Sequence, residues 1–96
     1  MYGMIARLTA AAGQRSRVIR ILGDATASMP GCLGYVIAED AADPDVIWVT
    51  EVWDSQAAHD ASLSLPQVLQ AIAEVRPLIP QFERIAVTSP VRGVQA

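Results

Sequence analysis

The order of strand-like and helix-like segments is the feature that most limits what this chain can fold into. Residues 2–9, 33–39, 47–53 and 82–89 have the alternation or the apolar and aromatic content typical of β-strands. Residues 40–45, rich in Asp and containing Pro, predict a hairpin connection between the second and third strands. Two other stretches have the apolar spacing of helices. The predicted order is β-α-β-β-α-β, the arrangement of a ferredoxin-like α+β domain.

Both helical stretches have recognisable boundaries. An apolar stripe over residues 18–29 indicates the first helix, and Pro30-Gly31 is expected to end it. Asp54-Ser55 offers side-chain oxygens that can cap a second helix directly after the third strand. Pro66 suits the first position of a further helical piece, which should end before Pro77.

The predicted four-stranded antiparallel sheet is apolar on both faces, although its helices can cover only one. Residues 46–49 and 85–87 are apolar without alternation. Such a sheet needs a second cover, and the simplest one is another copy of the chain related by a two-fold axis. Trp48 lies an odd number of residues from Trp53, so the two side chains point to opposite faces. We therefore predict a homodimer with Trp48 in its interface.

Length and composition exclude several classes of protein. Ninety-six residues predict a single domain, residues 1–96, with a tail at 90–96. A net charge of −3 argues against nucleic-acid binding. No apolar run reaches the roughly 20 residues of a membrane span. Because Cys32 is the only cysteine, no internal disulfide is possible, and we expect a cytoplasmic protein.

Three segments together resemble the antibiotic biosynthesis monooxygenase family, and its quinol-monooxygenase-like members in particular. They are the first strand followed by Gly13, the turn at residues 30–35 (Pro-Gly-Cys-Leu-Gly-Tyr), and residues 51–55 (Glu-Val-Trp-Asp-Ser), which match the family's E-x-W-x-S pattern. The resemblance covers nearly the whole chain. It implies a dimeric α+β barrel that oxidises phenolic or quinol substrates with O2, in many members without flavin, metal or haem.

The chemistry that the resemblance implies needs few protein groups. A base removes a phenolic proton, and the resulting anion is electron-rich enough to reduce O2 in a flat, apolar, water-excluding pocket. The sequence contains neither a Gly-rich phosphate-binding loop nor a cluster of residues at metal-ligand spacing. We therefore expect no cofactor and no metal.

The chain departs from the family where many members have two histidines. Those positions hold Ser62 and Gln67 here, and only Pro66 of the Thr-Pro-His segment is retained. The haem-degrading branch uses a Trp, a His and an Asn. Here Ser62 and Ile72 stand at the Trp and His positions, and the chain has no Asn. Haem degradation is therefore not expected.

His59 is the predicted general base, because imidazole titrates near pH 6.5 and His59 is the only histidine. We expect it at the margin of the inward helix face. That face is predicted to consist of Ala57, Ala58, Ala61 and Leu65. The alternative is a partly exposed histidine without a task.

The remaining candidates are predicted to bind substrate. Trp53 can form an aromatic wall of the pocket, and Tyr35 can donate a hydrogen bond to a substrate oxygen; for both, packing in the core is the alternative. Glu51 shares a strand face with Trp53 and needs a partner, for which Arg84 or Arg76 is expected. A purely structural ion pair is the alternative for Glu51. Arg84 itself is also predicted to bind substrate, and Arg7, Ser62 and Gln67 are further candidates.

Three functions remain open from the sequence. The first is a cofactor-independent oxygenase acting on a small aromatic with O2. The second is a non-catalytic small-molecule-binding dimer, which the absence of both family histidines favours. The third is an isomerase or lyase in which the same base removes a carbon-bound proton without O2.

Overall fold

The computed structural model describes residues 1–93, and its elements follow the predicted order. They are β1 (Tyr2–Thr9), α1 (Arg15–Ala25), β2 (Cys32–Glu39), β3 (Val46–Trp53), α2 (Gln56–Ser62), α3 (Pro66–Val75), the 3-10 helix η1 (Arg76–Leu78) and β4 (Gln81–Thr88). Each strand begins and ends within one residue of its predicted bounds. The second helical stretch is divided into α2 and α3. Of the tail predicted at residues 90–96, residues 94–96 lie outside the described residues.

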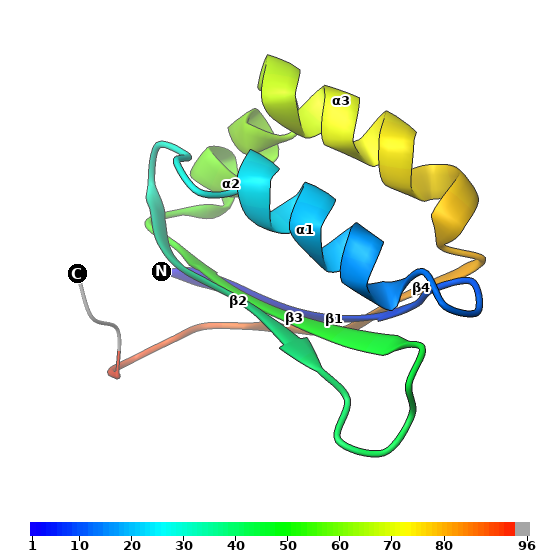
Figure 1. Cartoon of the computed structure of the whole chain (residues 1–96). Coiled ribbons are helices and arrows are strands. Elements are labelled where there is room, and N and C mark those ends of the chain that lie inside the picture. Colours follow the sequence, from blue (N-terminus) through cyan, green and yellow to red (C-terminus); the bar gives the residue numbers. More distant parts are fainter. Residues whose placement is uncertain (94–96) are drawn as a thin grey trace.

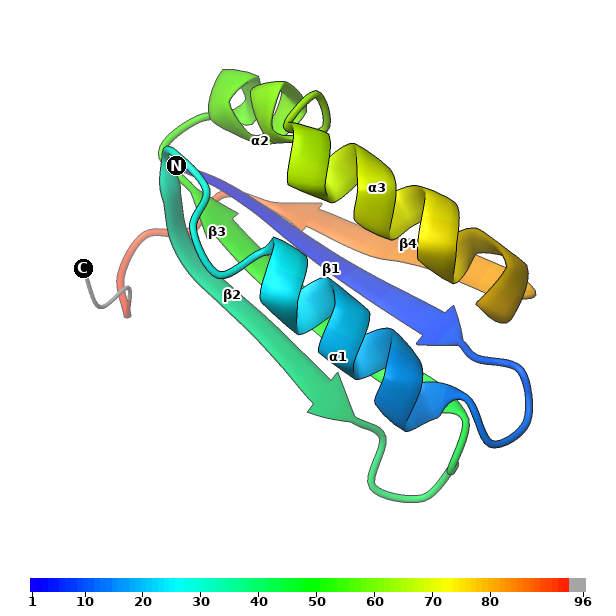
Figure 2. The same cartoon turned by 45° about the horizontal axis from the view of Figure 1, so that its top comes forward.

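The strands form an antiparallel sheet in the order β2-β3-β1-β4. β1 is central and pairs with β3 from Tyr2 opposite Trp53 to Thr9 opposite Val46. Figures 1 and 2 show all three α-helices on one side of this sheet, with the other side bare. The ferredoxin-like α+β fold with helices on one face is thereby confirmed.

The structure corrects the predicted end of the first helix. α1 ends at Ala25, although the apolar stripe continues to Met29. The backbone N–H and the hydroxyl of Thr26 both donate to the carbonyl of Leu22, at 3.1 and 2.7 Å, and so close the last turn. Met29 is still buried, because the irregular chain after the helix folds back onto the core. The apolar stripe therefore predicted correctly that Met29 is buried, but not that the chain there is no longer helical.

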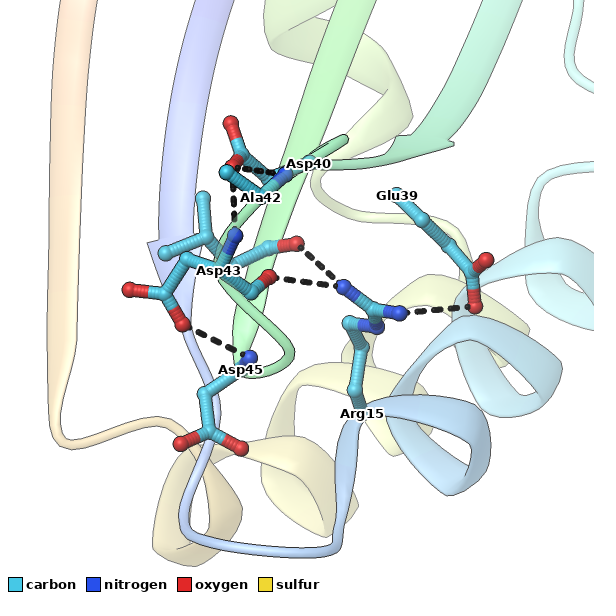
Figure 3. Close-up of polar contacts among 7 residues, drawn as sticks. Arg15, Glu39, Asp40, Ala42, Asp43 and Asp45 are labelled. Atoms are coloured by element: carbon cyan, nitrogen blue, oxygen red, sulfur yellow. Dashed lines mark hydrogen bonds and ion pairs between the residues drawn. The ribbon is translucent and has the colours of Figure 1, made fainter.

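The hairpin connection between β2 and β3 is organised by the side chain of Asp40 (Figure 3). Its Oδ2 accepts hydrogen bonds from the backbone N–H groups of Asp43 at 2.8 Å and Ala42 at 3.0 Å. Its Oδ1 accepts one from Trp48 Nε1 at 2.8 Å. The bonds from Asp43, Trp48 and Ala42 stabilise the carboxylate and lower the pKa of Asp40 to about 2.

Arg15 connects the first turn of α1 to this hairpin, as Figure 3 shows. Its guanidinium donates to the carbonyl oxygens of Asp43 at 2.9 Å and Val46 at 3.4 Å. It also lies 3.3 Å from the carboxylate of Glu39. The helix layer and the far end of the sheet are therefore joined by one side chain.

Trp48 and Trp53 lie on opposite faces of the sheet, as predicted. Trp53 is buried under the helices, whereas Trp48 is half-buried on the bare face, where the guanidinium carbon of Arg7 lies 5.8 Å from its ring centroid. Arg7 in turn pairs with Glu83 of β4 at 2.6 Å. Within residues 1–93, no helix is both long enough and apolar enough to cross a bilayer.

Candidate functional site

A cavity of about 450 Å³ lies between the helices and the sheet face that they cover. Its volume falls within the range of small-molecule sites, and most of its lining is apolar. Six of the residues predicted to act on or bind substrate line it: His59, Trp53, Tyr35, Glu51, Ser62 and Arg84. These residues come from α2 and three strands, so the fold brings together positions that are far apart in the chain.

Two local features place α2, and with it His59. The hydroxyl of Ser55 accepts a hydrogen bond from the N–H of Ala58 at 3.1 Å, which confirms the predicted cap. Gly31, directly before β2, has a φ of +79°, and a Cβ there would lie 2.7 Å from the Cβ of Ala58. Glycine at this position therefore lets the chain before β2 approach α2 closely.

The structure corrects the predicted inward face of α2. His59 is not at its margin: it is buried, with 5% of its surface exposed, and Ser62 is buried one turn later. Ala57 and Ala61 face solvent instead. Residues three apart lie on the same side of a helix, and α2 turns the side with 59 and 62 toward the sheet. The partial exposure that the alternative interpretation assumed is therefore wrong.

Two aromatic rings hold the imidazole of His59. The ring of Trp53 meets it nearly edge-on, with centroids 5.7 Å apart and planes at 80°. The ring of Tyr2 lies 5.2 Å away at 37°. Tyr2 was not among the predicted site residues. Its contact depends on the β1–β3 register, which puts Tyr2 opposite Trp53 and which the sequence does not reveal.

Glu51 is buried beside these rings, and its partner is not an arginine as predicted. Trp53 Nε1 donates to Glu51 Oε1 at 2.9 Å, and His59 Nε2 lies 4.0 Å from the same oxygen. Among residues 1–93, no arginine lies within ion-pair distance of Glu51. Burial raises the pKa of Glu51, while the Trp53 hydrogen bond and the charges of His59 and Arg84 act in the opposite direction.

The other ring nitrogen of His59 has a different partner. Nδ1 lies 3.1 Å from Oδ1 of Asp60, a side chain that is largely exposed. A carboxylate at Nδ1 favours the tautomer in which this nitrogen carries the proton and donates. Nε2, on the side of Glu51, then presents its lone pair and can accept a proton.

Tyr35 and Ser62 contribute differently to the cavity. Tyr35 pairs across the sheet with Glu51, and burial, with the nearby Glu51 charge, raises the pKa of its hydroxyl. It therefore stays neutral and can donate a hydrogen bond. The hydroxyl of Ser62 instead donates to the carbonyl of His59 at 2.6 Å, so its proton is already used within α2.

Three other residues are not brought into this cavity. Arg7 lies on the bare face, and Gln67 is exposed on α3. Cys32 lines a separate cleft of about 510 Å³ between the end of α1 and β2, and burial raises the pKa of its thiol. In the part of the chain that the structure describes, no three His, Cys, Asp or Glu residues are grouped so that they could hold a metal ion.

Comparison with known proteins agrees with this fold. A crystal structure from Chloroflexus aurantiacus J-10-fl, which bears the name antibiotic biosynthesis monooxygenase, is 52% identical over 98% of this chain and 96% of its own, with a TM-score of 0.88. One of the same name from Deinococcus radiodurans is 26% identical over 100% and 98%, with a TM-score of 0.81. Rv0793 from Mycobacterium tuberculosis, 24% identical over 98% of both chains, shares the fold at a TM-score of 0.81.

The match extends from structure to sequence. No curated protein matches the chain. The family model described as antibiotic biosynthesis monooxygenase, however, matches residues 1–74, which include β1 to β3, α2 and most of α3. The chain belongs to the antibiotic biosynthesis monooxygenase family.

Proposed function

We propose that this protein is a cofactor-independent monooxygenase that oxidises a small phenolic or quinol-type aromatic with O2. One observation carries the proposal: the only histidine of the chain is buried in the wall of an apolar cavity, held by two aromatic rings, with a carboxylate oxygen 4.0 Å from its Nε2. A buried histidine with this set of neighbours suits acid–base work better than structural packing alone.

In the first step, Nε2 of His59 takes the proton of a substrate hydroxyl. The hydrogen bond between Nδ1 and Asp60 holds the tautomer that leaves Nε2 free to accept. The imidazolium that forms is stabilised by Glu51, whose orientation is fixed by Trp53 Nε1. Tyr35 can donate a hydrogen bond to a second oxygen of the substrate and so orient its ring.

In the second step, the substrate anion is the reductant. For a hydroquinone, one oxygen atom of O2 is added to the ring and the other leaves as water, so hydroquinone and O2 give a hydroxyquinone and one molecule of water. All four electrons come from the substrate, and no further reductant is needed. The protein supplies an apolar, water-poor cavity with Trp53 as a wall, which favours this chemistry over proton return from solvent.

Replacing the base tests the proposal. With a panel of hydroquinones in an oxygen electrode, His59→Gln should lower kcat/KM by about 10²–10⁴-fold, the usual contribution of a positioned base. Gln67→Ala is the matched control, because Gln67 is exposed at one of the positions where many family members have histidine. Oxygen uptake that is no faster with the protein than without it, or that is unchanged in His59→Gln, would contradict the proposal.

A second candidate function is a non-catalytic binding protein. It is favoured by Ser62 and Gln67 at the positions of the family histidines, since the Ser62 hydroxyl is already bonded within α2 and Gln67 lies outside the cavity. Aromatic ligands that bind without consuming O2 would support this function. Turnover under nitrogen would instead support an isomerase or lyase.

We also propose that the protein works as a homodimer through the bare face of its sheet. Trp48, half-buried over Arg7, and Val36, which is 59% exposed, lie on this face. A second copy would cover the apolar side chains there without closing the cavity, which lies on the other side of the sheet.

A further inference from the structure

We infer that the cavity selects an aromatic substrate that carries a carboxylate, and that Arg84 and Arg76 bind this carboxylate. The inference rests on the proposed function and adds a substrate class to it. Both arginines line the cavity that contains His59. Arg76 belongs to η1, which directly follows α3, and Arg84 belongs to β4.

Neither arginine has a carboxylate partner among residues 1–93, in contrast to Arg7 and Arg15. The two acidic residues nearest in sequence are engaged elsewhere. Glu83 accepts hydrogen bonds from Arg7 and Gln81, and Glu74 accepts one from Gln70. Two guanidinium groups therefore line one apolar cavity with their hydrogen-bonding capacity available for an anion.

The charge at this site runs against that of the whole chain. The net charge is −3, yet the charged side chains that line the cavity are two arginines and one glutamate, besides His59. The charge of Arg84 already acts on Glu51 and partly opposes the rise of its pKa that burial causes, although the two make no ion pair. Both arginines are exposed to solvent at the cavity, so a carboxylate bound by both would replace water as the partner of their guanidinium groups.

The spacing also separates the anion site from the base. Along β1, Glu51 pairs with Met4, whereas Arg84 pairs with Ala6 on the other side of the strand. Strand geometry then puts the Cα atoms of Glu51 and Arg84 about 12 Å apart. A compact aromatic can therefore have its hydroxyl at His59 and its carboxylate at the arginines. This arrangement predicts that the reacting hydroxyl and the carboxylate are recognised at different positions of one ring.

Binding under nitrogen tests the inference without requiring turnover. We would titrate the protein calorimetrically with 2,5-dihydroxybenzoate and with its neutral counterpart 2,5-dihydroxybenzamide. The acid should bind about 5- to 30-fold more tightly, which is the range for a charge-assisted hydrogen-bonded pair near solvent. The preference should shrink in 1 M NaCl, because salt screens exposed charges.

Single substitutions then assign the preference to the two arginines. Arg84→Gln and Arg76→Gln should each reduce the preference for the acid and leave the affinity for the amide unchanged. The control is Arg20→Gln, because Arg20 is exposed on α1 and lies outside the cavity; this variant should keep the full preference for the acid. Equal affinities of acid and amide for the unaltered protein, or a preference that survives both substitutions together, would overturn the inference; so would failure of the acid to bind.

The outcome also separates this inference from the proposed function. Tight, arginine-dependent binding of the acid with no O2 consumption would support the anion site and contradict the monooxygenase. Oxidation of neutral hydroquinone with a KM as low as that of the acid would support the monooxygenase and contradict the anion site.

Discussion

At the scale of single residues, the buried carboxylate of Glu51 affects both the stability of the fold and the proposed chemistry of the site. Its pKa is raised in the folded protein, so the native state holds a proton that the unfolded chain releases once the pH exceeds the ordinary value of 4.5. Stability therefore falls as the pH rises from 4.5 through the raised pKa. Above this window the ionised carboxylate weakens the fold, but it is the form that stabilises a protonated His59.

Glu51→Gln should accordingly make the protein more stable and less active. At pH 7 the melting temperature should rise by a few degrees, because the buried charge is removed while an amide oxygen can still accept from Trp53 Nε1. The kcat/KM with a hydroquinone should fall about tenfold or more. Thermal unfolding and oxygen uptake measure the two effects, with exposed Glu74→Gln as control. A less stable variant with unchanged pH dependence would contradict this reading of Glu51.

At the scale of elements, Asp40 is the residue on which the β2–β3 hairpin depends. Its pKa is lowered from 3.8 to about 2, so its contribution to stability is complete above about pH 4 and is lost as the pH falls toward 2. Asp40→Asn should lower the melting temperature at pH 7 by several degrees and flatten its decline between pH 4 and pH 2.

The control for Asp40 is its neighbour Asp45→Asn. The carboxylate of Asp45 makes no hydrogen bond or ion pair with any residue from 1 to 93, and Figure 3 shows it turned away from the turn that Asp40 organises. Thermal unfolding from pH 2 to pH 7 should therefore be nearly unchanged in this variant. Equal effects of the two substitutions would mean that general charge, and not the Asp40 hydrogen bonds, stabilises the hairpin.

The elements were largely predictable from the sequence, because alternation, caps and proline act locally. Ser55 and Pro66 marked the starts of α2 and α3, and the strands were found within one residue. What failed depended on tertiary packing. The end of α1 was set by Thr26, while the apolar stripe continued to Met29 for reasons of burial alone.

The candidate site was predictable in its members but not in its contacts. Six of the predicted residues line one cavity, whereas Arg7 and Gln67 lie outside it. The burial of His59 followed from how α2 turns against the sheet, and a helix of seven residues is too short for its apolar spacing to reveal that rotation. The contact of Tyr2 with His59 depends on strand register, and the place of Arg76 in the cavity lining depends on the path of the chain after α3; a local pattern records neither.

At the scale of the whole molecule, the bare sheet face predicts self-association. Val36→Asp places a charge on that face without disturbing the cavity, and should convert a dimer into folded monomers at micromolar concentration. Leu69→Asp, at a position with similar exposure on the outer side of α3, should leave the dimer intact. Analytical ultracentrifugation decides between the outcomes, and an unaltered protein that sediments as a monomer would contradict the prediction.

The alternation of the strands has a consequence for how such a chain can diverge. In β1 the even positions face the cavity and in β3 the odd ones do, so neighbouring residues serve different sides of the sheet. A substitution at a cavity-facing position can thus change ligand affinity without affecting association, and one at an outward-facing position can change association without affecting ligand affinity. Inserting or deleting one residue within a strand would interchange the two sets beyond it. Related chains should therefore differ in length at their loops and keep the lengths of β1 and β3.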